Sequence, residues 1–113
     1  MAISPGPLFE PLQLLSGAAI YYVASANTRI DKLTVANQDI NPRQVQIYWV
    51  PSGGSLSTPG AIIIPTFDLQ PAESRDLWQF IGHILGVGDG IGASCDDSGV
   101  VNFFGSGTQI TPT

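Results

Sequence analysis

The stretch that decides the fold is VQIYWVPSGGSLSTPGAIII, residues 45–64. Its first six residues place Val45, Ile47 and Trp49 on one side of an extended chain, and this period of two predicts a β-strand. Residues 51–60 are rich in Gly, Ser and Pro and offer too little apolar surface to fold back onto a core, which predicts an exposed loop. A strand, a loop and a second apolar run in so short a stretch indicate an all-β protein.

The second apolar run, AIII at residues 61–64, is continuous rather than alternating. We expect a strand covered on both faces, either by the opposite sheet and a loop or by a neighbouring subunit. The composition favours the subunit, because 43% of the chain is hydrophobic and only 12% is charged, so a monomer would expose more apolar surface than soluble monomers usually do. We therefore predict a homotrimer with an interface at Ile62, Ile63 and Ile64.

Short apolar runs between turn clusters continue through the rest of the chain. Ile and Val number 19 against nine Leu, and β-branched side chains favour pleated sheets over helices. This spacing predicts an antiparallel sandwich or barrel of about eight strands, with few helices. Residues 81–85 also fit one helical turn, and we interpret them as extended. The predicted extended segments are 18–24, 30–36, 45–50, 61–64, 75–80, 81–85, 91–95, 100–104 and 108–111.

Two turn-rich stretches connect these segments. NQDINPR at residues 37–43 carries turn residues and predicts a hairpin between segments 30–36 and 45–50. Glycines at positions 86, 88, 90 and 92 predict a bulge or a close approach of neighbouring backbones. GDGIGA at residues 88–93 fits a dinucleotide-binding fingerprint on paper, but that motif must open a helix, whereas a further turn follows here.

The N-terminal residues 1–13 differ from the predicted β-sandwich domain of residues 14–113. Their prolines remove backbone donors and favour an extended arm. Because such a segment is not expected to fold on itself, we predict that it lies along another molecule, anchored by its apolar side chains. The candidate partner-binding residues of this arm are Pro5, Pro7, Leu8, Phe9, Pro11 and Leu12.

Charge and cysteine content exclude several classes of protein. Four basic and nine acidic residues give a net charge of −5, the wrong sign for binding nucleic acid through phosphates. The longest apolar and small stretch, residues 17–26, is far shorter than the ~20 residues of a membrane span. No Lys or Arg precedes Arg29, and Cys95 is the single cysteine, so we expect neither a secretory signal nor an intrachain disulfide, but assembly in a reducing cytoplasm.

Catalytic and metal-binding groups are few. Cys95 and His83 are the only candidates for a Cys/His dyad, and we interpret them as a buried small side chain and a partly exposed strand residue. Asp89, Asp96 and Asp97 are candidate Ca²⁺ ligands, but they lack the spacing of a calcium loop and fit solvated acidic turns better. We therefore predict that the protein is not an enzyme and holds no cofactor or metal.

A carbohydrate-binding module is the alternative from another class. Flat aromatic rings beside polar groups form such sites, although most of the aromatic residues here fit a core. An exposed Trp49 or Trp78 beside an Asn or Asp in a groove would indicate this function.

Several motifs, in order along most of the chain, resemble those of small single-domain virion proteins of tailed bacteriophages. The similar stretches are LLSG at 14–17, TRIDKLTVAN at 28–37, VPSGG at 50–54, IGHIL at 81–85 with Gly88 and Asp89, and SGTQIT at 106–111.

This resemblance implies a β-sandwich, often jelly-roll-like, that acts as a capsid decoration (cement) protein or as a tail, neck or fibre component. It supplies no catalytic residues. We expect a decoration protein made in the host cytoplasm, which binds the major capsid protein on the outer surface of the head and stabilises it. Closed cyclic symmetry would bury the apolar faces of three such subunits.

Overall fold

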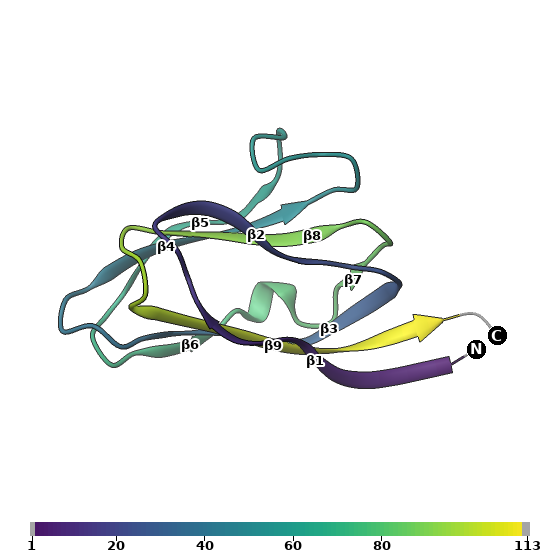
Figure 1. The fold of residues 1–113 in the computed structure, drawn as a ribbon, viewed down its shortest axis with the longest axis horizontal. Helices are drawn as coiled ribbons and strands as arrows, with labels where there is room; N and C mark the ends of the chain where they lie inside the picture. Colours follow the sequence, from purple (N-terminus) through teal and green to yellow (C-terminus); the bar gives the residue numbers. More distant parts are fainter. Residues whose placement is uncertain (1, 112–113) are drawn as a thin grey trace.

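The computed structural model describes the backbone of residues 2–111 and the side chains of residues 5–110. Met1 of the predicted arm and the last two residues of the predicted domain lie outside this range. The described chain forms nine strands and one short 3-10 helix, η1, and contains no α-helix (Figure 1). These elements are β1 Ala2–Gln13, β2 Gly17–Val23, β3 Asn27–Asn37, β4 Arg43–Val50, β5 Ile62–Leu69, β6 Ser74–Asp76, η1 Trp78–Phe80, β7 Ile84–Leu85, β8 Gly90–Cys95 and β9 Val101–Thr111.

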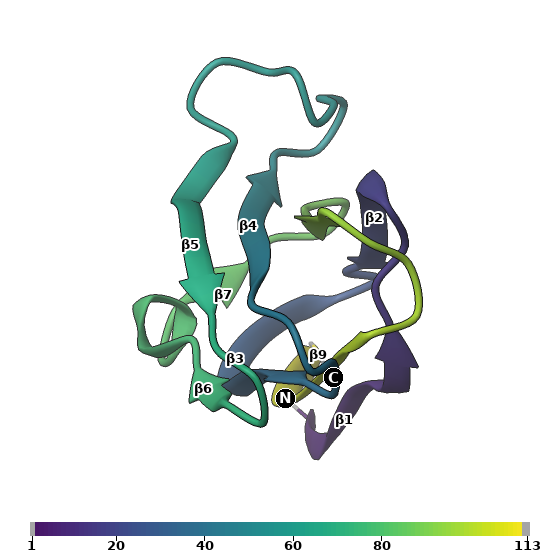
Figure 2. The same ribbon diagram turned by 90° about the vertical axis from the view of Figure 1, so that its left-hand side faces the viewer.

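The strands form two sheets that pack face to face (Figures 1 and 2). The first has the order β1-β9-β3-β6, with β7 also paired to β3, and the second has the order β2-β8-β4-β5. Every strand pair is antiparallel. The prediction of a single antiparallel β-sandwich is confirmed.

The path of the chain between the sheets is that of a jelly roll. Strands β1 to β4 alternate between the two sheets, and β4 and β5 are neighbours. Strands β6 and β7 then lie in the first sheet, β8 in the second and β9 in the first again. Strands β6 and β7 both pair with β3, at residues 34–36 and 28–29 respectively, so they occupy one position that η1 interrupts. The nine strands therefore fill the eight positions of a jelly roll, in agreement with the predicted architecture of about eight strands.

Alternation along β3 and β4 builds the core between the sheets. Leu33 and Val35 of β3 are fully buried, as are Val45 and Ile47 of β4. Where Ile30 pairs with Gly107 and Lys32 with Ser106, Asp31 is an extra residue in β3. Such a bulge resets the alternation, which is why Ile30 also points inward.

The predicted hairpin at residues 37–43 is wrong, because β3 and β4 belong to different sheets. The side-chain amide of buried Asn37 donates to the carbonyl oxygens of Leu69 at 2.9 Å and Asn41 at 3.0 Å, and its oxygen accepts from the Asp39 N–H. These bonds tie the segment to the end of β5. The chain therefore crosses between the sheets instead of closing a tight turn.

The prediction of extended structure over residues 75–85 is only partly confirmed. Residues 78–80 form η1, and strand structure resumes only at Ile84. Leu77 and Phe80 are both buried, and a spacing of three residues places two side chains on the same side of a helical turn. At the C-terminal end, the two predicted strands 100–104 and 108–111 are one continuous strand, β9.

The N-terminal segment is extended, but it is the edge strand β1 of its own sandwich. It pairs with β9 from Ala2 opposite Thr111 to Gln13 opposite Asn102. A Cβ atom on Gly105 or Gly107 would lie 3.5 or 2.7 Å from a methyl carbon of Leu8, so these glycines leave the space that Leu8 fills. The expectation of an arm that does not fold on its own chain is therefore wrong.

Candidate interaction surfaces

The predicted interface residues lie on β5, the edge strand of the four-stranded sheet. Ile64 is buried, whereas Ile62 is 49% and Ile63 is 40% exposed. Ile62 pairs with Tyr48 and Ile64 with Ile47, so Ile63 is an extra residue that bulges from the strand. The two exposed isoleucines are not covered within the chain. We expected this run to be covered either by the opposite sheet and a loop or by a neighbouring subunit. The first does not cover Ile62 and Ile63, and the second stays a prediction.

Further apolar side chains are exposed on the same side of the sandwich. Figure 2 shows β5, β6 and β7 together on one side, and the Arg75 guanidinium on β6 lies 4.9 Å from the Phe67 ring of β5. Because Leu77 and Phe80 point into the core around η1, side chains next to them face solvent, and Trp78 is 72% exposed. We call this surface the β5–β7 patch, and it consists of Ile62, Ile63, Trp78, Ile81 and Ile84.

A second group of exposed apolar side chains lies on β2, the other outer strand of the same sheet, and in the segment just before it. Leu15 and Val23 are each 57% exposed and Ile20 is 43% exposed. A Cβ atom on Gly90 of β8 would lie 3.3 Å from Ile20 and 3.8 Å from Val23, so these two side chains lie together over that glycine. We call Ile20 and Val23 the β2 patch; Leu15 lies apart from them, next to Ser16, which bridges to Cys95 at the other end of β8.

The residues of both patches are uncharged, but the side chains of Arg75 and Asp76 of β6 are 40% and 55% exposed on the same side of the sandwich as the β5–β7 patch. Residues 14–28, which include the β2 patch, carry no Asp, Glu, Lys or Arg, and neither do residues 61–67 or 77–87. The apolar composition of residues 17–26 was the available signal for the β2 patch, but its length served only to exclude a membrane span. Trp78, Ile81 and Ile84 gave no signal, because nothing in the local pattern shows which side of η1 is covered.

All four outer edges of the two sheets carry features that hinder the addition of another strand. Strand β1 contains three prolines, β2 has a register shift between Ile20 and Tyr22, and β5 has two shifts and Pro65. Strands β6 and β7 have three and two residues. Prolines, bulges and short lengths protect sheet edges from pairing with other chains. A partner is therefore expected to bind these edges through side chains rather than by adding a strand. The same holds for β1, the predicted arm.

The six candidate arm residues divide into two groups. Leu8, Phe9 and Leu12 are half-buried against the hydrophobic core, and the Phe9 ring centroid lies 5.0 Å from that of Phe103. The prolines at positions 5, 7 and 11 are exposed. The apolar anchors therefore stabilise this chain itself, and a partner contact through the three prolines stays a prediction.

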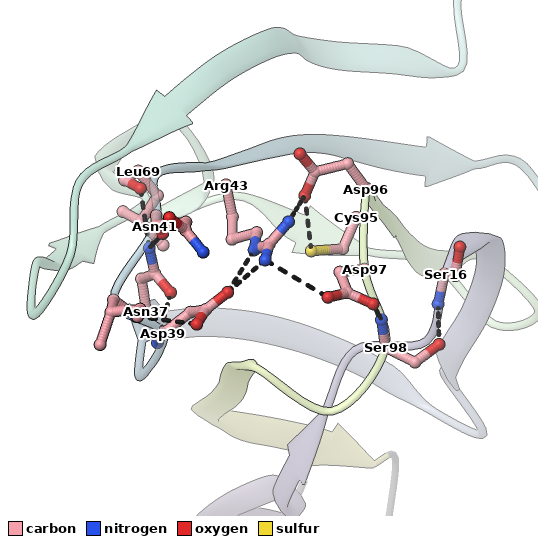
Figure 3. Close-up of polar contacts among 11 residues, drawn as sticks. Ser16, Asn37, Asp39, Asn41, Arg43, Leu69, Cys95, Asp96, Asp97 and Ser98 are labelled. Atoms are coloured by element: carbon pink, nitrogen blue, oxygen red, sulfur yellow. Dashed lines mark hydrogen bonds and ion pairs between the residues drawn. The ribbon is translucent and has the colours of Figure 1, made fainter.

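The most connected polar cluster surrounds Arg43 at the start of β4 (Figure 3). Its guanidinium pairs with Asp39, and its nitrogens lie 3.3 Å from Asp97 Oδ2 and 3.9 Å from Asp96 Oδ1. The hydrogen bond from Arg43 holds the pKa of Asp39 below its usual range. This cluster joins the crossing segment 38–42 to the turn after β8, which is a structural role.

The candidate dyad residues lie at opposite ends of β8. Cys95 is buried at its C-terminal end, 3.8 Å from Asp96 Oδ1, and burial raises the pKa of the thiol. His83 is exposed and its ring lies 5.8 Å from that of Trp49, which pairs with Ile91 near the start of β8. The structure does not bring the two residues together.

The three candidate metal ligands are also separated along β8. Asp89 precedes the strand and accepts hydrogen bonds from Ser52 N at 2.9 Å, Gly86 N at 3.0 Å and Trp49 Nε1 at 3.4 Å. Asp96 and Asp97 follow the strand. Within the described residues, no three His, Cys, Asp or Glu side chains are placed to hold a metal ion.

The two tryptophans considered for sugar binding differ in exposure. Trp49 is half-buried and stacks on Phe80 with centroids 6.2 Å apart, and Trp78 is exposed on the β5–β7 patch. Two shallow cavities of about 220 and 250 Å³ lie elsewhere, and neither tryptophan lines them. The first lies beside Pro7 and Tyr22, and the second lies beside Gln46 and Ser94.

No protein family, curated protein or solved structure matches this chain. Within residues 2–111, no helix is long and apolar enough to cross a membrane.

Proposed function

We propose that this protein is a structural subunit of a tailed-bacteriophage virion. In this proposal it is a capsid decoration (cement) protein that binds the major capsid protein on the outer surface of the head as a homotrimer. The observation that carries the proposal is the exposure of apolar side chains on both outer strands, β2 and β5, of one sheet of a small jelly-roll sandwich. The motifs that resemble small phage virion proteins support the same function.

The physical basis of a cement protein is linkage. A ligand that binds the assembled shell better than its separated subunits stabilises the shell by mass action. The fold suits this task, because the prolines, bulges and short lengths of its edge strands resist aggregation through strand pairing. Made in the host cytoplasm, the protein would add to the shell of the head.

The test compares phage particles that contain the protein with particles from which its gene has been deleted. We expect the deleted particles to release their genome at a lower temperature or under milder osmotic shock. Addition of the purified protein should restore the stability, and imaging of the restored particles should locate it over the capsid three-fold positions. Identical release curves would contradict the proposal and favour a tail, neck or fibre role.

A further inference from the structure

We infer that the cavity between the edge strands β1 and β2 binds one ring of a neutral sugar. It is the first of the two cavities described above, with a volume of about 220 Å³. Its lining residues come from β1, β9 and β2. This binding does not depend on the role in a virion that is proposed above.

The cavity opens at one flank of the sandwich. Strands β1 and β2 are outer strands of the two different sheets, and Figure 2 shows both of them on the same flank. Tyr22 of β2 lines the cavity from one sheet, and Leu8 of β1 and Gln109 of β9 line it from the other. All three side chains are half-buried, whereas Gly6 at the rim is exposed. A ligand can therefore enter from solvent and contact both sheets.

A bulge in β2 directs Tyr22 toward this cavity. The register shift between Ile20 and Tyr22 makes Tyr21 an extra residue in the strand, and a bulge changes the direction of the side chains that follow it. Tyr22 is directly opposite buried Ile91, and directly opposed residues share a face of the sheet. Its ring centroid lies 6.3 Å from that of Phe9. The aromatic ring is thus held between the sheets rather than on the outer surface.

Gly6 leaves space beside these side chains. It is directly opposite Gly107 and shares its face of the first sheet. Gly107 makes room for Leu8, but a Cβ atom at Gly6 would meet nothing within 4 Å, and Gly6 does not adopt a positive φ. Neither backbone conformation nor close packing therefore requires glycine at this position. The missing side chain keeps the cavity open.

The chemistry of the lining identifies the class of ligand. The residues that line the cavity in the described part of the chain include no Asp, Glu, Lys or Arg, so a charged ligand would find no countercharge. Tyr22 provides a flat ring and a hydroxyl group, and the Gln109 amide can both donate and accept a hydrogen bond. A sugar ring matches this set, because its C–H face packs on an aromatic ring while its hydroxyls bond to amide and hydroxyl groups.

The size of the cavity limits the ligand to a single ring. Sites for drug-sized molecules usually have volumes of about 300–1,000 Å³, and this cavity is smaller. Because it opens at the flank, further sugars of a chain would extend into solvent. We therefore expect weak binding of a monosaccharide, with a dissociation constant on the order of 1 mM.

Titration of the ¹⁵N-labelled full-length protein with monosaccharides tests the inference. The probes are the methyl glycosides of glucose, galactose, mannose and N-acetylglucosamine, and two-dimensional NMR records the backbone amide signals. We expect at least one glycoside to shift the signals of Gly6, Tyr22 and Gln109 in a saturable way. If no glycoside shifts these signals, the inference is wrong.

Variants locate the site. Gly6→Val fills the space without a clash in the fold and should weaken binding at least tenfold, and Tyr22→Phe and Gln109→Leu should each weaken it several-fold by removing one polar group. Tyr48→Phe, on the outer face of the other sheet, is the matched control and should bind like the wild type. Circular dichroism should show that every variant is folded. Wild-type binding by Gly6→Val would overturn the inference.

A further probe distinguishes a sugar from a protein side chain. N-acetyl-tyrosine amide carries a ring and amide groups but no sugar, and we expect it to leave the signals of Tyr22 and Gln109 unchanged. If it shifts them and the glycosides do not, the cavity takes a side chain of a partner protein and the inference is wrong. These measurements use the purified protein, so they can fail while the particle-stability test succeeds, and the reverse.

Discussion

Gly107 in β9 lies between the backbone of β3 and a side chain of β1. A Cβ atom there would lie 2.6 Å from the Arg29 carbonyl oxygen and 2.7 Å from Leu8 Cδ2. Gly6 is its partner across the β1–β9 ladder, and a Cβ atom at Gly6 would meet nothing within 4 Å. The two glycines form a matched pair for testing how closely β1, β9 and β3 pack.

We predict that Gly107→Ala lowers the free energy of unfolding by about 1–3 kcal/mol, the usual cost of overpacking. Gly6→Ala should change it by less than about 0.5 kcal/mol. Urea denaturation of both variants and the wild type measures the difference. Equal stability of the two variants would show that β1 does not pack on β9 as described.

Three carboxylates have a pKa below their usual range. The pKa of Asp31 is lowered chiefly by the hydrogen bond from Arg29, that of Asp39 by the bond from Arg43, and that of Glu73 by the Gln70 N–H and then Arg75. A depressed pKa in the folded state means that the unfolded chain takes up protons first as the pH falls. These groups therefore stabilise the fold above the pKa of free carboxyls and lose that effect below it.

We predict that the free energy of unfolding stays level down to about pH 5 and then falls steadily toward about pH 3. Urea denaturation across this range measures it. Asp39→Asn should show a weaker fall, because Asn keeps the shape of the side chain but has no proton to gain. Stability that is independent of pH down to the acid limit would contradict the prediction.

At the scale of elements, the loop at residues 51–60 is held against the sandwich by the apolar side chain of Leu56 and by the hydrogen bond from Ser52 N to Asp89. Leu56 packs against the small cluster of Tyr48, Val50 and Ala61 on the outer face of the second sheet. A Cβ atom on Gly92 would lie 2.7 Å from Leu56 Cδ2, so that glycine leaves room for it. The loop is largely exposed, as predicted, but it is held in place.

We predict that Leu56→Ala frees this loop and leaves the sandwich intact. The cost in unfolding free energy should be about 1 kcal/mol, less than for a core leucine because Leu56 is only half-buried. Cleavage within the loop by a broad-specificity protease should become several-fold faster. Ser57→Ala is the matched control and should be cut like the wild type; an unchanged rate for Leu56→Ala would show that Leu56 does not hold the loop.

Strand positions could be predicted where one face of a strand is buried. The alternation in β3 and β4 and the glycine spacing before β8 were visible in the sequence, and the register shift between Ile20 and Tyr22 beside Gly90 and Gly92 agrees with the predicted close approach. Pairing could not be predicted in the same way, because it depends on distant residues. The crossing after β3 depends on Asn37 reaching Leu69, and the place of β1 depends on Gly105 and Gly107.

At the scale of the whole molecule, the same limit applies to the candidate surfaces. The apolar composition indicated an interface and β5 as part of it, and Ile62 and Ile63 are indeed exposed. The β2 patch and the residues around η1 become visible only when the jelly roll places β2 and β5 at opposite edges. Composition can therefore predict that apolar surface exists, whereas topology decides on which sides of the molecule it lies.

In the proposed homotrimer, the exposed apolar side chains and the net charge of −5 together set the salt dependence of association. Salt screens the repulsion between like-charged copies but has little effect on apolar contacts. We predict that the dissociation constant of the oligomer falls when NaCl is raised from about 0.02 M to about 0.5 M. Sedimentation equilibrium at each concentration measures it. Ile63→Asp, which adds one negative charge inside the predicted interface, should associate more weakly at every salt concentration and show a steeper salt dependence. Association of the wild type that weakens with added salt would indicate an interface held by ion pairs, and the predicted apolar interface at Ile62, Ile63 and Ile64 would then be wrong.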